Sequence, residues 1–173
     1  MRLNIKGKNK SMSKTEVKFA LGYFAHKLMG SRLPKNIEID LIFAPIREIG
    51  VGDGYCHPYE AGRSPRSFEI MIDSTMPRHK QLITLAHEMV HVKQYARNEL
   101  SSDSPVSAKF AGKNYRITQS LEDYLDYPWE IEAFGRERGM YVLYQLLLRQ
   151  EKIKFRNGKM YMRGKYTKIG KGK

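Results

Sequence analysis

Leu-Ala-His-Glu-Met-Val-His-Val-Lys-Gln, residues Leu85–Gln94, contains the pattern His-Glu-x-x-His at His87, Glu88 and His91. Residues four apart on a helix lie one above the other on the same face, so both imidazoles can bind one metal ion at about 2 Å. Glu88 projects beside them, where it can accept a proton from a water molecule whose pKa a zinc ion lowers toward neutrality. This stretch therefore predicts a hydrolytic zinc site.

The residues around the motif predict one buried helix. They are strongly apolar, which is expected of a helix inside a domain rather than on its surface. Pro77 suits the first helical turn, and the helix is expected to run to about Asn98. The alternative is a pair of core or surface histidines that bind no metal.

Length and composition indicate a single soluble domain. A chain of 173 residues is long enough to bury a real core, and the lone Cys56 has no partner for an internal disulfide. The first residues lack the apolar run of a signal peptide, and no stretch approaches the roughly 20 apolar residues of a membrane-spanning helix. We therefore expect a cytoplasmic protein without a membrane partner.

The net charge of +13 is concentrated in the two ends of the chain. Residues 1–14 carry five Lys or Arg and no acid, and residues 149–173 carry ten against Glu151. Such ends can attract nucleic acid or an acidic partner, or they can be solvated segments that keep the protein soluble. We expect a basic N-terminal arm at 1–14, a metallopeptidase domain at 15–150, and a basic C-terminal hairpin and tail at 151–173.

Apolar periodicity and turn residues predict an α+β fold. It would consist of a small, mostly antiparallel sheet packed on an N-terminal helix, the active helix and a C-terminal ligand helix. The elements expected besides the active helix are a helix over 13–29, strands over 36–45, 55–57 and 67–73, a hairpin over 110–117, a helix from about 127 to 149 and a hairpin over 153–162.

A hydrolytic zinc site needs a third protein ligand and an open position for water. No histidine follows His91, which leaves a carboxylate. Glu130 and Glu132 are two apart on a helix, about 200° around its axis, so both cannot face one ion. The small Ala133 shares a face with Glu130 and allows close helix packing, whereas Glu132 shares one with Arg136 and can form an exposed ion pair. We predict Glu130.

Two pieces of sequence, His87–Gln94 and Tyr127–Ala133, resemble gluzincin-type metallopeptidases, in particular the small single-domain zinc peptidases of bacteria and phages. The resemblance implies a minimal zincin-like domain with one Zn²⁺ ion, and its downstream Glu-x-x-Ala pattern matches Glu130. The SprT-like family is similar near the active helix but uses a third histidine.

The resemblance also bears on the residues that support the ligands. Related families often place Asp or Asn just after the Ala of this pattern, where it supports the metal ligands. Here that position is Phe134, so Asp126 or Glu137 would have to supply the support.

The sequence thus predicts a zinc metallopeptidase, a hydrolase in which Glu88 is the general base. Its substrate would be a peptide or protein that extends the sheet at the strand Phe68–Ile72. The alternative is a nucleic-acid-associated protein with a structural zinc site and functional basic ends. A structural site has no need of a base such as Glu88 between its histidines.

Overall fold

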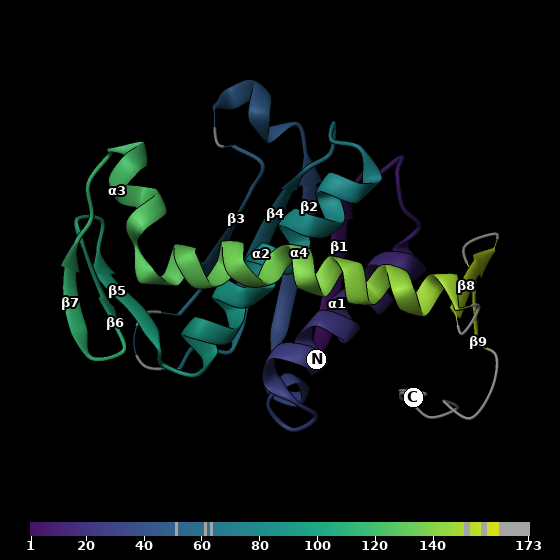
Figure 1. The fold of residues 1–173 in the computed structure, drawn as a ribbon, viewed down its shortest axis with the longest axis horizontal. Helices are drawn as coiled ribbons and strands as arrows, with labels where there is room; N and C mark the ends of the chain where they lie inside the picture. The colour runs from purple at the N-terminus through teal and green to yellow at the C-terminus, as the bar shows by residue number, and fades with distance from the viewer. Residues whose placement is uncertain (51, 61, 63, 151–152, 157–158, 163–173) are drawn as a thin grey trace.

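The computed structural model describes residues 1–50, 52–60, 62, 64–150, 153–156 and 159–162. A four-stranded mixed sheet forms one layer of the fold (Figure 1), in the order β1 (Arg2–Gly7), β2 (Glu38–Ala44), β4 (Ser67–Asp73) and β3 (Gly54–Pro58). β2 runs parallel to β1 and β4, and β3 runs antiparallel to β4. The sheet thus has two edge strands, β1 and β3.

The α+β class is confirmed, but the expectation of a mostly antiparallel sheet is wrong for this principal sheet. Parallel neighbours need a long crossover, and α1 (Lys14–Met29) provides one between β1 and β2. Residues Arg2–Gly7, expected as part of a basic arm, are the edge strand β1. Two short 3₁₀ helices, η1 (Leu33–Asn36) and η2 (Ile46–Ile49), flank β2 along the chain.

Helices α1 and α2 (Arg78–Ala96) pack on one face of the sheet, and α4 (Pro128–Arg149) lies across α2 as the outermost layer (Figure 1). Alternate residues of the central strands, such as Leu41 and Ile70, are fully buried against these helices. The opposite face is polar, and Asp40 there accepts a hydrogen bond from Lys6 at 2.8 Å. All the helices that build the core therefore lie on one side of the sheet.

Local signals set the ends of α1 as the sequence predicts. The Ser13 hydroxyl accepts a hydrogen bond from the backbone N–H of Glu16 at 3.2 Å, and the helix ends at Gly30 with a φ of 74°. β4 spans the predicted Ser67–Asp73 and leads into α2. Helix α2 ends at Ala96, two residues before the expected Asn98. Helix α2, which carries the His-Glu-x-x-His motif, therefore follows directly after a buried central strand.

A second, three-stranded sheet packs against the beginning of α4. Its strands are β5 (Leu100–Ser104), β6 (Ser107–Phe110) and β7 (Lys113–Arg116), and α3 (Leu121–Asp126) follows them. A hairpin was predicted over 110–117, about Gly112–Asn114. The observed hairpin β6–β7 begins three residues earlier, at Ser107, and turns at Ala111–Gly112, where both residues have positive φ. β5 and α3 were not predicted, because β5 is polar and α3 is only six residues long.

The predicted C-terminal hairpin is present as β8 (Ile153–Arg156) paired antiparallel with β9 (Lys159–Met162). β8 lies against α4, and β9 lies against α1. The turn expected at 157–158 and the tail at 163–173 lie outside the described residues. Within the described part of the chain, no helix is long and apolar enough to cross a membrane.

Gly7 tests the register between β1 and β2. It has a φ of 81°, and a Cβ at this position would lie 2.1 Å from the backbone oxygen of Phe43. We expect Gly7→Ala to lower the free energy of unfolding by about 2 kcal/mol or more. Gly22→Ala in α1 is the control, because its Cβ would meet nothing within 4 Å, and it should stabilise by about 0.5–1 kcal/mol. Urea unfolding measures both changes. A Gly7→Ala protein with the same free energy of unfolding as wild type would contradict this register.

Candidate metal centre

Helices α2 and α4 bring His87, His91 and Glu130 together in the interior. The two Nε2 atoms lie 3.1 Å apart. One carboxylate oxygen of Glu130 is 3.3 Å from Nε2 of His87, and the other is 3.4 Å from Nε2 of His91. The three side chains predicted to bind the metal therefore surround one point.

The spacing of these donor atoms fits a metal ion. In a tetrahedral site with ligand bonds of 2.0–2.1 Å, neighbouring ligand atoms are about 3.3 Å apart, which is close to all three separations here. Oε2 of Glu130 is also buried without a hydrogen-bond partner among the described residues. Because a buried carboxylate oxygen without a partner is costly, the group is suited to hold a cation.

Gln94 fixes the orientation of His91. Its amide nitrogen donates to the backbone oxygen of Trp129 at 2.9 Å, so its Oε1 must face Nδ1 of His91, also at 2.9 Å. Nδ1 of His91 then carries the proton, and Nε2 presents its lone pair to the triad. The residue that orients His91 thus lies about one turn further along the same helix.

Glu137 has the same role for His87. Its Oε2 lies 2.9 Å from Nδ1 of His87, which places the proton on Nδ1 and the lone pair on Nε2. At the position after Ala133, where the sequence resemblance led us to look for Asp or Asn, the ring of Phe134 contacts the His87 ring edge to face, with the ring centroids 4.7 Å apart. Of the two candidates for this support, Glu137 lies at the site and Asp126 is exposed at the end of α3.

The structure places Glu130, and not Glu132, against the histidines. Glu132 faces the other side of α4 and accepts hydrogen bonds from Lys93 at 2.7 Å and Gln94 at 3.1 Å. It also forms the predicted ion pair with Arg136, at 2.8 Å. Its role is therefore to tie α4 to α2 rather than to bind the metal.

Close packing at the start of α4 sets the position of Glu130. Ala133 is fully buried, so α4 approaches α2 without an intervening side chain. Trp129 stacks on Tyr127 with ring centroids 4.5 Å apart, and both pack against the second sheet. The residue that precedes Glu130 is thus held on both sides, by the aromatic cluster and by Gln94.

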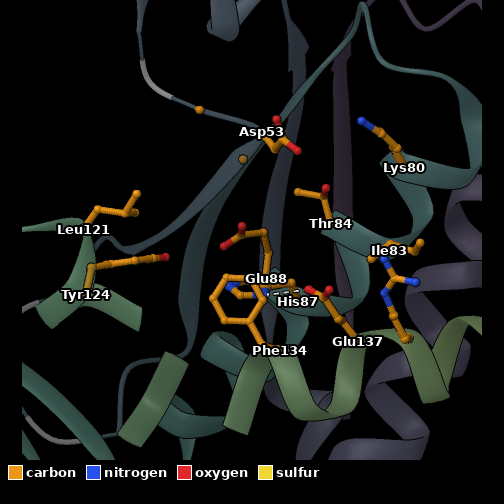
Figure 2. A pocket seen from close by; sticks show the side chains of 13 residues that line it. Asp53, Lys80, Ile83, Thr84, His87, Glu88, Leu121, Tyr124, Phe134 and Glu137 are labelled. Carbon is orange, nitrogen blue, oxygen red and sulfur yellow. Dashed lines mark hydrogen bonds and ion pairs between the residues drawn. The ribbon is translucent and has the colours of Figure 1, made fainter. Parts of the chain in front are cut away.

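Glu88 is buried beside the triad and borders two open cavities, of about 580 and 160 Å³. Figure 2 shows Glu88 and His87 in the middle of the larger one, with Tyr124 on one side and Lys80 on the other. Gly54 leaves room for Glu88, because a Cβ there would lie 3.1 Å from Oε1 of Glu88 and 2.6 Å from the methyl group of Thr84. The carboxylate can therefore meet a molecule that enters the cavity.

The strand that borders the cavities is β3, not β4. The expectation that Phe68–Ile72 forms a free sheet edge is wrong, because β4 is paired on both sides, with β2 and β3. The sequence did indicate that β3 is the edge strand, because Pro58 restricts the strand that contains it to a sheet edge. Residues Gly54 and Cys56 of β3 line the smaller cavity together with His91 and Glu130.

Buried charges perturb the pKa values of the whole group. Burial lowers the pKa of His87, but the carboxylates of Glu130, Glu137 and Glu88 outweigh it and raise that pKa to about 10. The pKa of His91 is raised by the same balance of burial against carboxylates. Burial opposes ionisation of Glu130, yet the two imidazoles lower its pKa to about 2. Without a metal, the triad therefore holds protons at neutral pH.

Tyr124 is a site residue that the sequence did not identify. It borders both cavities, and its pKa is raised by burial and by the charge of Glu130, so its hydroxyl remains a donor. It belongs to α3, a short helix whose N-cap is Ser120 and whose six residues carry no clear apolar pattern. The contact of Gln94 with His91 could have been predicted from the sequence, because Gln94 lies three residues after His91 in the same helix.

The chain matches no protein-family model, no curated protein and no solved structure. Its site is therefore defined by its own geometry, a buried His-His-Glu group that could hold a metal ion.

Zinc affinity should separate the two candidate glutamates. Glu130→Gln should weaken zinc binding by at least about 100-fold, because loss of a partner behind a ligand already costs 10–100-fold. Glu132→Gln, its matched control on the same helix, should change the affinity by less than about tenfold. Competition with a chromophoric chelator measures both. A larger loss for Glu132→Gln than for Glu130→Gln would overturn the assignment.

Zinc affinity should also depend on pH. Because the pKa of His87 is raised to about 10, zinc must displace a proton at neutral pH, and it competes better as protons become scarce. The affinity should rise about tenfold per pH unit for each proton released, between pH 6 and 9. Calorimetry in buffers of different ionisation enthalpy counts these protons. A zinc affinity that does not change with pH in this range would refute the raised pKa of His87.

Proposed function

We propose that this chain is a zinc metallopeptidase of the gluzincin kind, in which Glu88 is the general base. The observation that carries the proposal is the position of Glu88, which is buried beside His87, His91 and Glu130 at the floor of an open cavity. The ligand order, two histidines on one helix and a glutamate on a later one, agrees with the resemblance in sequence. Zinc is the ion that this donor set suits best.

A zinc ion bound here would supply Lewis acidity toward water and toward a carbonyl oxygen. Glu88 takes a proton from the attacking water and returns it to the leaving amine. Burial raises the pKa of Glu88, which makes its carboxylate a better proton acceptor. The hydroxyl of Tyr124 would donate a hydrogen bond to the oxygen on which negative charge develops, because Tyr124 borders the same cavities and remains protonated.

An extended substrate would bind along β3. This strand has a neighbour on one side only within the described sheet, and β4 is that neighbour. β3 also contacts α2, and its residue Gly54 borders both cavities. A peptide paired with the other edge of β3 would place one of its bonds over Glu88.

The alternative is a nucleic-acid-associated protein with a structural metal site. Such a site closes its fourth position with a protein ligand, but the described residues supply three donors and an open cavity. Part of the N-terminal basic charge is also neutralised, because Arg2 pairs with Glu38 at 3.6 Å and Lys6 with Asp40 at 2.8 Å. Both observations favour the peptidase.

The test is Glu88→Gln. The amide keeps the shape of the side chain but cannot accept a proton, so peptide hydrolysis should fall by about 10²–10⁴-fold while zinc remains bound. Glu48→Gln, an exposed change in η2, is the control and should keep full activity. Hydrolysis of a casein-derived peptide pool, followed by mass spectrometry, and zinc content by elemental analysis provide the two measurements. Activity at the wild-type level in Glu88→Gln would refute the mechanism.

A further inference from the structure

The larger cavity extends past His87 and Glu88 on both sides, and Lys80 lines it on the side away from Tyr124. Contacts of His87 with Glu137 and of His91 with Glu130 show that α2 and α4 run antiparallel. Lys80 lies seven residues before His87, and Arg138 directly follows Glu137, so both are on the same side of the triad. Both line the cavity, and Figure 2 shows Lys80 across it from Tyr124.

The charges of Lys80 and Arg138 are uncompensated within the described residues. Three acids line the same cavity: Asp53 pairs with Arg47 at 2.8 Å, Glu137 pairs with His87 at 2.9 Å, and Glu88 lies beside the triad. Other cations on these helices behave differently, since Lys93 and Arg136 both pair with Glu132 at 2.7 and 2.8 Å. The far end of the cavity therefore presents two cations without a carboxylate partner among the described side chains.

Apolar side chains lie between this end and the triad. Ile83 lines the wall formed by α2, and Phe134 lines the wall formed by α4. Phe134 is 43 % exposed, whereas Leu121, which is 71 % exposed, lines the cavity on the other side of Glu88, next to Tyr124. Exposed apolar side chains on the rim of a cavity favour an apolar group of the ligand there.

We propose that Lys80 and Arg138 form a carboxylate-binding subsite. The substrates would then be peptides with a carboxylate two or three residues from the scissile bond and an apolar residue in between. This inference rests on the proposed peptidase function. Lys80 is about 10 Å from His87 along the axis of α2. An extended peptide spans about 3.3–3.6 Å per residue, so this distance corresponds to two or three residues of substrate.

Two groups in a peptide have this chemistry. One is the α-carboxylate at the C-terminus, which would make the protein cleave near the ends of chains. The other is the side chain of an internal Asp or Glu. Both bind through charge-assisted hydrogen bonds to Lys and Arg, so the geometry selects the carboxylate and not its source.

The experiment uses three synthetic, internally quenched octapeptides with the same apolar centre. The first has a free C-terminus and an internal Gln, the second is amidated with an internal Gln, and the third is amidated with an internal Glu at the same position. The zinc-loaded wild-type protein should cleave the first or the third at least about tenfold faster than the second, measured as kcat/KM. The faster one identifies the source.

Variants test the two cations themselves. Lys80→Met with Arg138→Met replaces both cations by unbranched neutral side chains and should abolish the preference. Lys80→Glu with Arg138→Glu should reverse it, so that an internal Lys is preferred to an internal Glu. Lys109→Met, an exposed change on β6, is the control and should leave the preference intact. An unchanged preference in both double variants would overturn the proposal.

Binding provides a readout independent of turnover. The Glu88→Gln protein loaded with zinc should bind fluorescein-labelled forms of the carboxylate peptide at least about tenfold more tightly than the neutral one. If wild type cleaves none of the peptides but this preference in binding is present, the peptidase proposal fails and the subsite stands. If wild type cleaves all three peptides at equal rates and binding shows no preference, the subsite is refuted and the peptidase proposal is unaffected. If it cleaves none and binding shows no preference, both proposals fail.

Discussion

The contact between α2 and α4 is the constraint on which the rest of this structure depends. Glu130 must lie within about 3.4 Å of both imidazoles, and a buried Ala133 makes this possible because it adds almost no width between the helices. The same contact supplies Glu137 behind His87 and the Glu132–Lys93 pair that ties the helices together. A single packing arrangement thus sets the ligands, their orientation and the end of the cavity.

Much of the site could be predicted because it depends on helical periodicity. The spacing of His87 and His91 and the choice of Glu130 over Glu132 both follow from positions around a helix axis. The edge strand was assigned to β4 instead of β3, because pairing between strands is set by contacts distant in sequence. Tyr124 was missed for the same reason, since only the tertiary structure brings the short α3 to the site.

The triad combines strong mutual interactions with a high cost of burial. Two imidazoles and three carboxylates share a poorly solvated volume, so each charge depends on its neighbours. Without a metal, protons on the histidines balance the carboxylates. A divalent cation would replace those protons at side chains whose positions Gln94 and Glu137 already fix. The site is preorganised, so little conformational entropy remains to be lost on binding.

The second sheet has a consequence for the lifetime of a bound metal. Trp129 and Tyr127 belong to a small apolar cluster with Leu100 and Ala108, separate from the main core, and this cluster holds the first turn of α4. Small peripheral clusters open more often than a central core. Each such opening would free Glu130 while both histidines stay on α2. Metal exchange would then follow the rate of local opening at β5–β7, at a free-energy cost below that of global unfolding.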